Sequence, residues 1–166
     1  MNRLYPAPLT PEAFAPFGHV IAAGAGEIRA LRGGALQLTR SSAALEARAQ
    51  GLALVFDHYD LPVSPLPLLL DTAERHDRTG QLFAPLPGCG DWLSVVWPGG
   101  GDQPTGAPMA FRAGPGQALI YAPGIWHAAI VALSGRGLFL SAMWRGEDGR
   151  DVDFAALDPV IEISWR

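Results

Sequence analysis

From residue 52 onward, the chain is a series of short apolar segments, each ended by glycine, proline or aspartate. Short segments with turn residues at such regular spacing are typical of β-strands in a sandwich or barrel. The clearest break is the loop at 98–104, Pro-Gly-Gly-Gly-Asp-Gln-Pro. The pattern predicts an all-β fold with strands over residues 52–58, 66–76, 81–86, 92–97, 109–112, 118–122, 127–133, 137–144 and 160–165.

Two short helices are predicted before this β region. Thr10 supplies a hydroxyl cap and Pro11 suits the first helical position, so a helix is expected to run from there to Gly18. A second is expected over residues 43–50, after Ser41-Ser42 and before Gly51. The sequence contains no internal repeat and no linker, so residues 1–166 are expected to form a single domain.

The charged residues exclude several classes of function. A net charge of -4 without a basic run argues against nucleic acid or an anionic membrane as a partner. All twelve cations are arginine, which excludes lysine Schiff-base chemistry and leaves arginine, backbone N–H groups or a metal to hold an acidic substrate. The single cysteine, Cys89, excludes an internal disulfide. With no secretory leader expected at the N-terminus, the predicted location is the cytoplasm.

Polar residues with a fixed spacing mark a candidate site. Glu74 and His76 are two apart on a predicted strand, so their side chains are expected to share one face. The turn at 77–80 is expected to form a hairpin that returns Gln81 to this pair. His127 follows a Pro-Gly turn at the start of a later strand. We expect these four side chains to form a polar patch inside an apolar cavity.

The same residues resemble the two-part signature of the cupins. The first part is usually His-x-His-x3–4-Glu-x6-Gly, and here Glu74 takes the first His position, Gln81 the Glu position and Gly88 the last. The second part is matched by Gly116, Gly124 and His127, with the proline displaced by one place. This resemblance implies a cupin-like β-barrel, that is, a double-stranded β-helix or jelly roll, with a few short helices.

Metal binding stays open from the residues alone. Two imidazoles and a carboxylate, from His76, His127 and Glu74, are suitable ligands for a divalent ion, and Gln81 adds a weaker amide oxygen. The alternative is a metal-free site in which Glu74 and His76 act as an acid–base pair.

Three further residues are candidates for binding an acidic substrate. Arg112 and Arg40 are candidate anchors for a carboxylate. Trp126 lies beside His127 and is a candidate pocket wall, although a buried tryptophan is more often part of the core.

At a finer level the chain resembles the ureidoglycolate lyases, formerly called ureidoglycolate hydrolases, from about Pro8 to Ile163. The segments that carry the resemblance are 9–14, 17–21, 74–76, 80–85 and 121–127. The resemblance implies a homodimer that splits ureidoglycolate into glyoxylate and urea in allantoin and purine catabolism, and nickel has been linked to the family.

The resemblance also implies roles for single residues. Glu74 and His76 are suited to the two proton transfers, with His127 shaping or sharing that task. Gln81 is placed to hydrogen-bond the ureido group. Tyr121 belongs to the third matching segment and is a candidate for substrate binding.

The chain departs from the usual family pattern at several positions. Ala128 stands where a histidine is common, Asp57 and Met109 where arginines are common, and Trp144 where an aspartate precedes the arginine. Two alternatives therefore accompany the lyase hypothesis. One is a non-catalytic or divergent cupin that binds a small hydroxy- or keto-acid. The other is a metal-dependent oxygenase, which the glutamate and glutamine substitutions disfavour.

Overall fold

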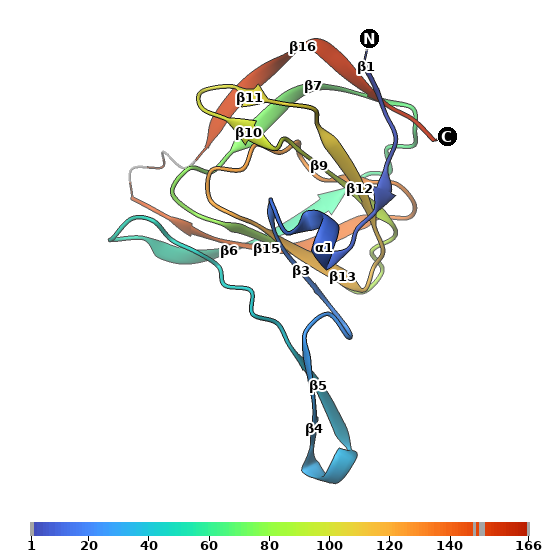
Figure 1. Cartoon of the computed structure of the whole chain (residues 1–166), viewed down its shortest axis with the longest axis vertical. Coiled ribbons are helices and arrows are strands. Elements are labelled where there is room, and N and C mark those ends of the chain that lie inside the picture. The colour runs from blue at the N-terminus through green and yellow to red at the C-terminus, as the bar shows by residue number, and fades with distance from the viewer. Residues whose placement is uncertain (1, 148, 150–151, 166) are drawn as a thin grey trace.

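Strands make up most of the computed structural model, which describes residues 2–147, 149 and 152–165. They wrap around a shared interior, with a hairpin projecting from one side (Figure 1). The largest sheet of the structure is antiparallel, and its strands have the order β3-β13-β8-β15-β6. The bounds of these strands are Gly18–Ala22, Gln117–Tyr121, Gln81–Pro85, Gly137–Arg145 and Ala53–Leu61.

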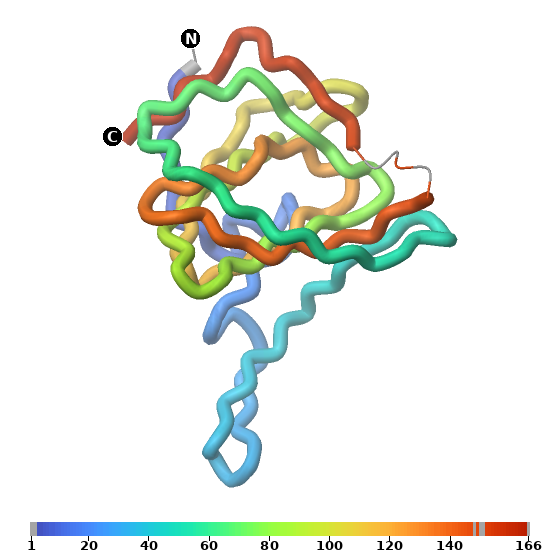
Figure 2. The backbone as a smooth tube through the Cα atoms, turned by 180° about the vertical axis from the view of Figure 1, so that it is seen from behind, coloured from blue at the N-terminus to red at the C-terminus, as the bar shows by residue number. Residues whose placement is uncertain are grey.

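Two further sheets complete the wall around the interior, and both are visible from behind in Figure 2. One has the order β14-β9-β12-β2, with bounds Val131–Ala132, Trp92–Val96, Met109–Ala113 and Ala7–Pro8. The other has the order β1-β16-β7, with bounds Asn2–Leu4, Asp153–Ile163 and Leu68–Arg75. His127 bridges the two sheets, because its backbone pairs with both Glu74 and Val96.

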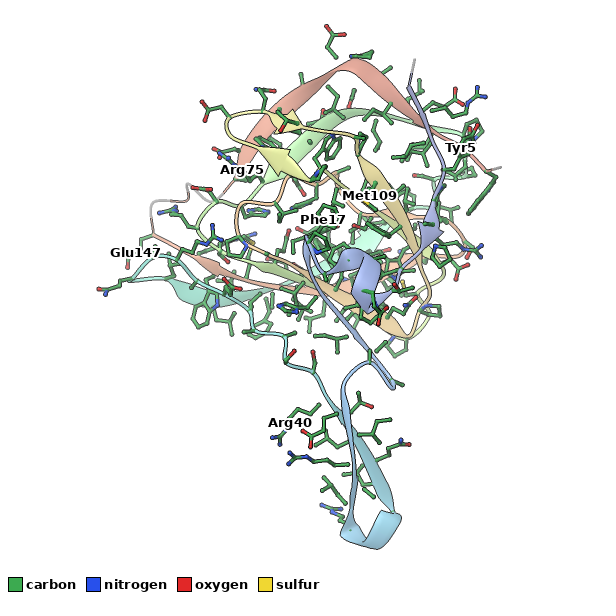
Figure 3. The ribbon with its side chains drawn as sticks, in the orientation of Figure 1. Tyr5, Phe17, Arg40, Arg75, Met109 and Glu147 are labelled. Atoms are coloured by element: carbon green, nitrogen blue, oxygen red, sulfur yellow. The ribbon has the colours of Figure 1, made fainter. Side chains whose placement is uncertain are left out.

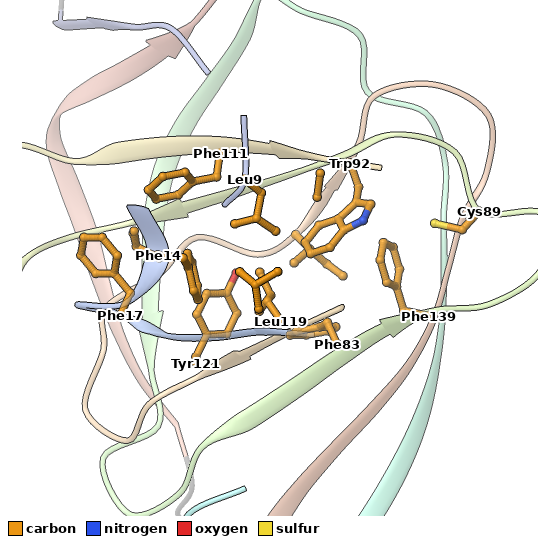
Figure 4. Close-up of a cluster of buried hydrophobic side chains, with 14 residues drawn as sticks. Leu9, Phe14, Phe17, Phe83, Cys89, Trp92, Phe111, Leu119, Tyr121 and Phe139 are labelled. Carbon is orange, nitrogen blue, oxygen red and sulfur yellow. The ribbon is translucent and has the colours of Figure 1, made fainter. Parts of the chain in front are cut away.

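Aromatic side chains fill one part of the interior (Figure 4). Phe139 is fully buried, and its ring packs edge-on against Trp92 at 5.3 Å and against Phe83 at 6.2 Å between centroids. Such edge-to-face pairs add to the stabilisation that burial of large rings provides. Tyr121 lies at the boundary of this core, since one neighbour is Phe83 and another is the imidazole of His127.

The projecting hairpin consists of β4 (Glu27–Leu31) and β5 (Leu36–Arg40), joined through the 3₁₀ turn η1 (Arg32–Gly34). A small ladder of β10 (Gly99–Gly100) and β11 (Pro104–Thr105) lies near β7. In the part of the chain that the structure describes, no helix has the length and apolar character needed to cross a bilayer.

The all-β, cupin-like fold predicted from the sequence is confirmed. The first short helix begins where predicted but is shorter, since Gly18 already belongs to β3. This helix, α1, spans Pro11–Phe14, and the Thr10 hydroxyl caps it by accepting a hydrogen bond from the Ala13 N–H at 3.2 Å.

The prediction of a second helix over residues 43–50 was wrong. Residues of this segment pair with the loop at 78–80 instead: the Arg48 N–H donates to the Arg78 carbonyl, and the Gly80 N–H to the Glu46 carbonyl. An eight-residue helix is only marginally stable in water, so these nonlocal hydrogen bonds determine the conformation.

Two expectations about strand pairing were also wrong. The turn at 77–80 does not form a hairpin, because β7 pairs with β16 while β8 pairs with β13 and β15. The strand expected at 127–133 is reduced to β14 and the isolated pairing of His127. Sequence periodicity located these segments without revealing their partners, since pairing depends on residues far away in the chain.

Candidate active site

Glu74, His76 and His127 come together at one end of the interior. One potential metal-ligating atom from each lies within 4.8 Å of the others. Glu74 lies at the end of β7 and His76 directly follows the strand, and their spacing of two residues suits side chains on one face. The backbone then fixes His127 opposite Glu74, with N–H···O bonds of 2.7 and 2.9 Å in the two directions. The first and second sequence motifs are therefore joined by the main chain itself.

A tight turn delivers His127 to this position. Gly124 has φ of 85°, a region that non-glycine residues rarely adopt, and its N–H donates to the His76 carbonyl at 2.9 Å. The turn thus holds the chain against the end of β7 just before His127. This explains why the Pro-Gly pair precedes the histidine in the sequence.

The imidazole of His127 is held as a neutral ring. It is 1% exposed and stacks on the Tyr121 ring, with centroids 4.0 Å apart and planes 2° apart. Burial, assisted by the neighbouring His76, lowers the pKa of His127 from 6.5 to about 3. Its Nδ1 lies 3.2 Å from the Ala128 carbonyl, while its buried Nε2 has no hydrogen-bond partner among the described residues. Nε2 is thus available to a substrate or a metal.

The pKa of Glu74 is shifted in the direction opposite to that of His127. Its side chain is 23% exposed, and Oε1 lies 3.6 Å from Nδ1 of His127. Burial raises the pKa of Glu74, because the desolvated carboxylate is less stable than the neutral acid. A carboxyl group with a raised pKa exchanges a proton more readily near neutral pH than an ordinary glutamate does.

Gln81 reaches the same region from β8. It is buried, pairs in register with Tyr121 and Met143, and donates through Nε2 to the Ser141 hydroxyl at 3.4 Å. Its Oε1 is buried without a partner in the described part of the chain. An unpaired buried amide oxygen costs free energy, so it marks a place where a ligand can supply the missing donor.

A cavity of about 200 Å³ opens beside His76. Met143 and Arg145 of β15 line it, together with Gly146, Gly149 and Val152. A more open depression of about 560 Å³ lies at residues 22–26, Pro11, Glu12 and Gln117, but its only ionisable side chain is Glu12. The smaller cavity is the candidate active site, because His76 of the three-residue cluster lines it.

Residues missed by the sequence analysis complete the site. The Arg145 guanidinium lies 3.0 Å from the Asp57 carboxylate. Tyr59 is two residues further along β6 and shares the face of Asp57. Burial raises the pKa of Tyr59, the Asp57 and Glu74 charges act in the same direction, and a hydrogen bond with Gln81 opposes them. The alternation of Asp57 and Tyr59 was a usable signal, whereas Arg145 lay one residue beyond a predicted strand.

Two other candidates, Tyr121 and Trp126, lie mainly in the apolar core. Tyr121 presents its ring to His127, but its hydroxyl points to Ser94 at 2.8 Å and lies in the core. Trp126 is buried in a second apolar cluster, where Nε1 donates to the Gly101 carbonyl at 3.1 Å. It packs in this core because side chains alternate along the chain and its neighbour His127 faces the site.

The two arginines proposed as carboxylate anchors do not reach the cluster. Arg112 is on the outer face of β12, where it pairs with Asp91 at 3.1 Å and lies over the Trp165 ring. Its neighbour Phe111 occupies the inner face and is fully buried. Arg40 is on the projecting hairpin (Figure 3).

The chemistry of the cluster suits a divalent metal ion. Two imidazoles and one carboxylate are a common donor set for zinc, nickel and iron. The Ala128 carbonyl can orient the His127 ring through Nδ1, which is the usual outer contact of a metal-ligating histidine. The unpartnered Nε2 of His127 and Oε1 of Gln81 are the donor atoms that an ion would satisfy.

Known proteins with similar sequences point to one family. A family model described as ureidoglycolate lyase matches residues 1–164. The ureidoglycolate lyase of Mesorhizobium japonicum is 35% identical over 163 residues, which cover 98% of this chain and 98% of the relative. The ureidoglycolate lyase of Chelativorans sp. is 32% identical, with 92% and 91% covered. That of Pseudomonas syringae pv. syringae is 32% identical, with 89% and 86% covered.

The buried neutral His127 predicts a loss of stability in acid. Because its pKa is about 3 in the fold and 6.5 when unperturbed, the unfolded chain takes up a proton that the native state resists. The free energy of unfolding keeps the full contribution of the neutral ring above pH 6.5. It decreases as the pH falls from 6.5 towards 3, by an amount on the order of a few kcal/mol. Urea unfolding in EDTA from pH 8 to pH 4 should show a steeper decline for wild type than for His127→Gln. Parallel curves for the two proteins would contradict the assignment.

Proposed function

The chain belongs to the ureidoglycolate lyase family, and we propose that it splits ureidoglycolate into glyoxylate and urea. The observation that carries the proposal is the convergence of Glu74, His76 and His127 beside a small cavity. A cavity of about 200 Å³ suits a substrate of this size. The activity is that of a carbon–nitrogen lyase in allantoin and purine catabolism.

The reaction requires two proton transfers. The central carbon of ureidoglycolate bears a hydroxyl group and the ureido nitrogen, which makes it a hemiaminal. When a base removes the hydroxyl proton, the oxygen electron pair forms the carbonyl of glyoxylate. The carbon–nitrogen bond then breaks, and the nitrogen takes a proton to leave as urea. No water or redox partner is consumed.

We assign the proton transfers to Glu74 and His76. The raised pKa of Glu74 suits a group that accepts the hydroxyl proton and releases it again, and His76 borders the cavity where the leaving nitrogen needs a proton. His127, kept neutral by burial, offers Nε2 as a hydrogen-bond acceptor to a donor group of the substrate. The unpaired Oε1 of Gln81 accepts a hydrogen bond from a ureido N–H.

Arg145 is the proposed partner of the substrate carboxylate. It lines the cavity beside His76, and the Asp57 carboxylate holds its guanidinium on one side. Guanidinium groups bind carboxylates through two parallel hydrogen bonds, which fixes the orientation of a small acid. This role replaces the one expected of Arg112 and Arg40, which are not at the cavity.

The alternative to these acid–base roles is that Glu74, His76 and His127 instead hold a divalent ion, with Gln81 nearby, and the family resemblance favours nickel. A bound ion would supply Lewis-acid polarisation of the hydroxyl oxygen. Protein purified without chelator or metal-affinity resin should carry about one divalent ion per chain by elemental mass spectrometry, and His76→Ala should carry much less. Full activity in a metal-free preparation would refute the metal site.

We also propose that the protein is a cytoplasmic homodimer. The family resemblance supports the dimer. The composition supports the compartment, since the single Cys89 is buried and needs no oxidising environment.

Removal of the Glu74 charge tests the lyase assignment. Glu74→Gln keeps the shape of the side chain but cannot accept a proton, so release of urea and glyoxylate should fall by at least about 100-fold. Glu12→Gln, an exposed change on α1, is the control and should retain full activity. Absence of turnover by the wild type, with or without added nickel, would refute the proposal. Thermal stabilisation by glyoxylate alone would then indicate a binding protein.

Replacement of Arg145 tests the carboxylate contact. Arg145→Gln should raise KM by roughly 10-fold or more, with a smaller effect on kcat, and Arg145→Lys should recover part of the loss. The matched control is Arg136→Gln, directly before the same strand, because Arg136 forms an exposed ion pair with Asp60 of β6. Equal effects of the two glutamine variants on KM would exclude a specific role for Arg145.

A further inference from the structure

The β4–β5 hairpin is the part of the fold that packs least against the rest. Every residue of β4 is exposed, and the hairpin extends away from the body on the side of the five-stranded sheet (Figures 1 and 2). Isolated two-stranded hairpins are at best marginally stable in water. A hairpin of this length therefore needs a surface to pack against.

One face of the hairpin is suited to such packing. The β4–β5 register and the strand period place Leu31, Leu36 and Leu38 on the same face. Leu31 is 39% exposed and Leu36 is 48% exposed, while Arg29 and Arg40 flank the leucines on this face. The opposite face carries Ile28, Ala30, Gln37 and Thr39, and so has one large apolar side chain against three on the leucine face. The leucine face thus combines large apolar side chains at the tip of the hairpin with charged ones nearer its base, a mixture that suits an interface between proteins.

The outer face of the five-stranded sheet is also apolar. The inward positions of β6 are occupied by Asp57 and Tyr59, so Phe56 points outward, and it is 62% exposed. Across the sheet the partly exposed outward positions are Leu140, Leu82, Ala84 and Ala118. Ala142, which is in register with Phe56, is buried, and the exposed His58 is in register with Leu140. The segment after the hairpin covers one edge of this face, where Leu45 accepts a hydrogen bond from Trp144. Contiguous apolar surface of this kind marks an interaction site.

The charges favour contact between the hairpin and the body of another copy. Residues 27–40 contain three arginines and one glutamate, which gives this segment two net positive charges. The whole chain carries a net charge of -4, so the rest of the chain is strongly acidic. An arm and a body of opposite sign attract each other across a twofold axis and disfavour arm-to-arm contact.

We propose that the leucine face of each hairpin packs on the outer face of the five-stranded sheet of a second copy. In a dimer with one twofold axis, each hairpin would cover the sheet of the other chain, so that both apolar surfaces of both chains are buried. The hairpin is close enough to this sheet, because it follows directly from β3. This inference rests on the proposed homodimer and names its surfaces: Leu31, Leu36 and Leu38 on one side and Phe56, Leu140 and Ala84 on the other.

Light scattering during size exclusion tests the interface. The wild type should elute as twice 17.6 kDa, whereas a chain with residues 27–40 replaced by Asn-Gly should be a monomer with unchanged circular dichroism. The short linker suits the site, since Glu27 and Arg40 are paired. Leu36→Asp should weaken the dimer at least 100-fold. Its matched control is Gln37→Asp, on the opposite face of the hairpin, which should leave the dimer intact.

The sheet surface is tested in the same way. Phe56→Asp should weaken the dimer, whereas Leu69→Asp should not, because Leu69 is 58% exposed on β7 in a different sheet. A mixture of the hairpin-deleted chain and Phe56→Asp should form mixed dimers by native mass spectrometry, since one intact arm meets one intact sheet. Absence of mixed dimers would overturn the arm-to-sheet arrangement.

The outcomes separate this inference from the proposals on which it rests. A hairpin-deleted chain that stays dimeric overturns the hairpin interface and leaves the homodimer standing. A monomeric wild type overturns both. Lyase activity is measured independently on the same samples, so its presence or absence bears on the proposed reaction and not on the interface.

Discussion

The two hydrogen bonds between the backbones of Glu74 and His127 are the constraint on which the rest of the site depends. They join segments 53 residues apart in the sequence and, with the Val96 pairing, connect two sheets. Because the main chain holds these residues in place, their side chains need few hydrogen bonds of their own. Nε2 of His127 and Oε1 of Gln81 can therefore stay unpaired, at a cost of about 1–3 kcal/mol each that a bound ligand would offset.

Burial divides the site into a neutral interior and a charged rim. It lowers the pKa of His127 and raises the pKa of Glu74, so both groups are displaced towards their uncharged forms. The Asp57–Arg145 ion pair lies further out, where both side chains remain partly exposed. The proposed proton transfers and the proposed anion contact would thus use neighbouring groups that differ in their exposure to solvent.

The positions of the strands could be predicted from the sequence better than the pairing between them. Alternating apolar residues and turn residues located β8, β9, β12, β13 and β15, and the spacing of Glu74 and His76 predicted their shared face. The pairing of β7 with β16 was not predictable, because it depends on contacts between distant segments. The segment 43–50, which follows two serines, was predicted as a helix for the same reason. Its local sequence gives no sign of the hydrogen bonds that it forms with the loop at 78–80.

Two ion pairs formed by β6 show most clearly what the local sequence does not reveal. Arg145, the last residue of β15, pairs with Asp57, and Arg136, directly before β15, pairs with Asp60, so the two pairs have the same chemistry. The strand period turns Asp57 inward and Asp60 outward. The exposed pair contributes little to stability, as surface ion pairs generally do. The inner pair places a guanidinium at the cavity beside His76, and only the register of two strands distinguishes it from its counterpart.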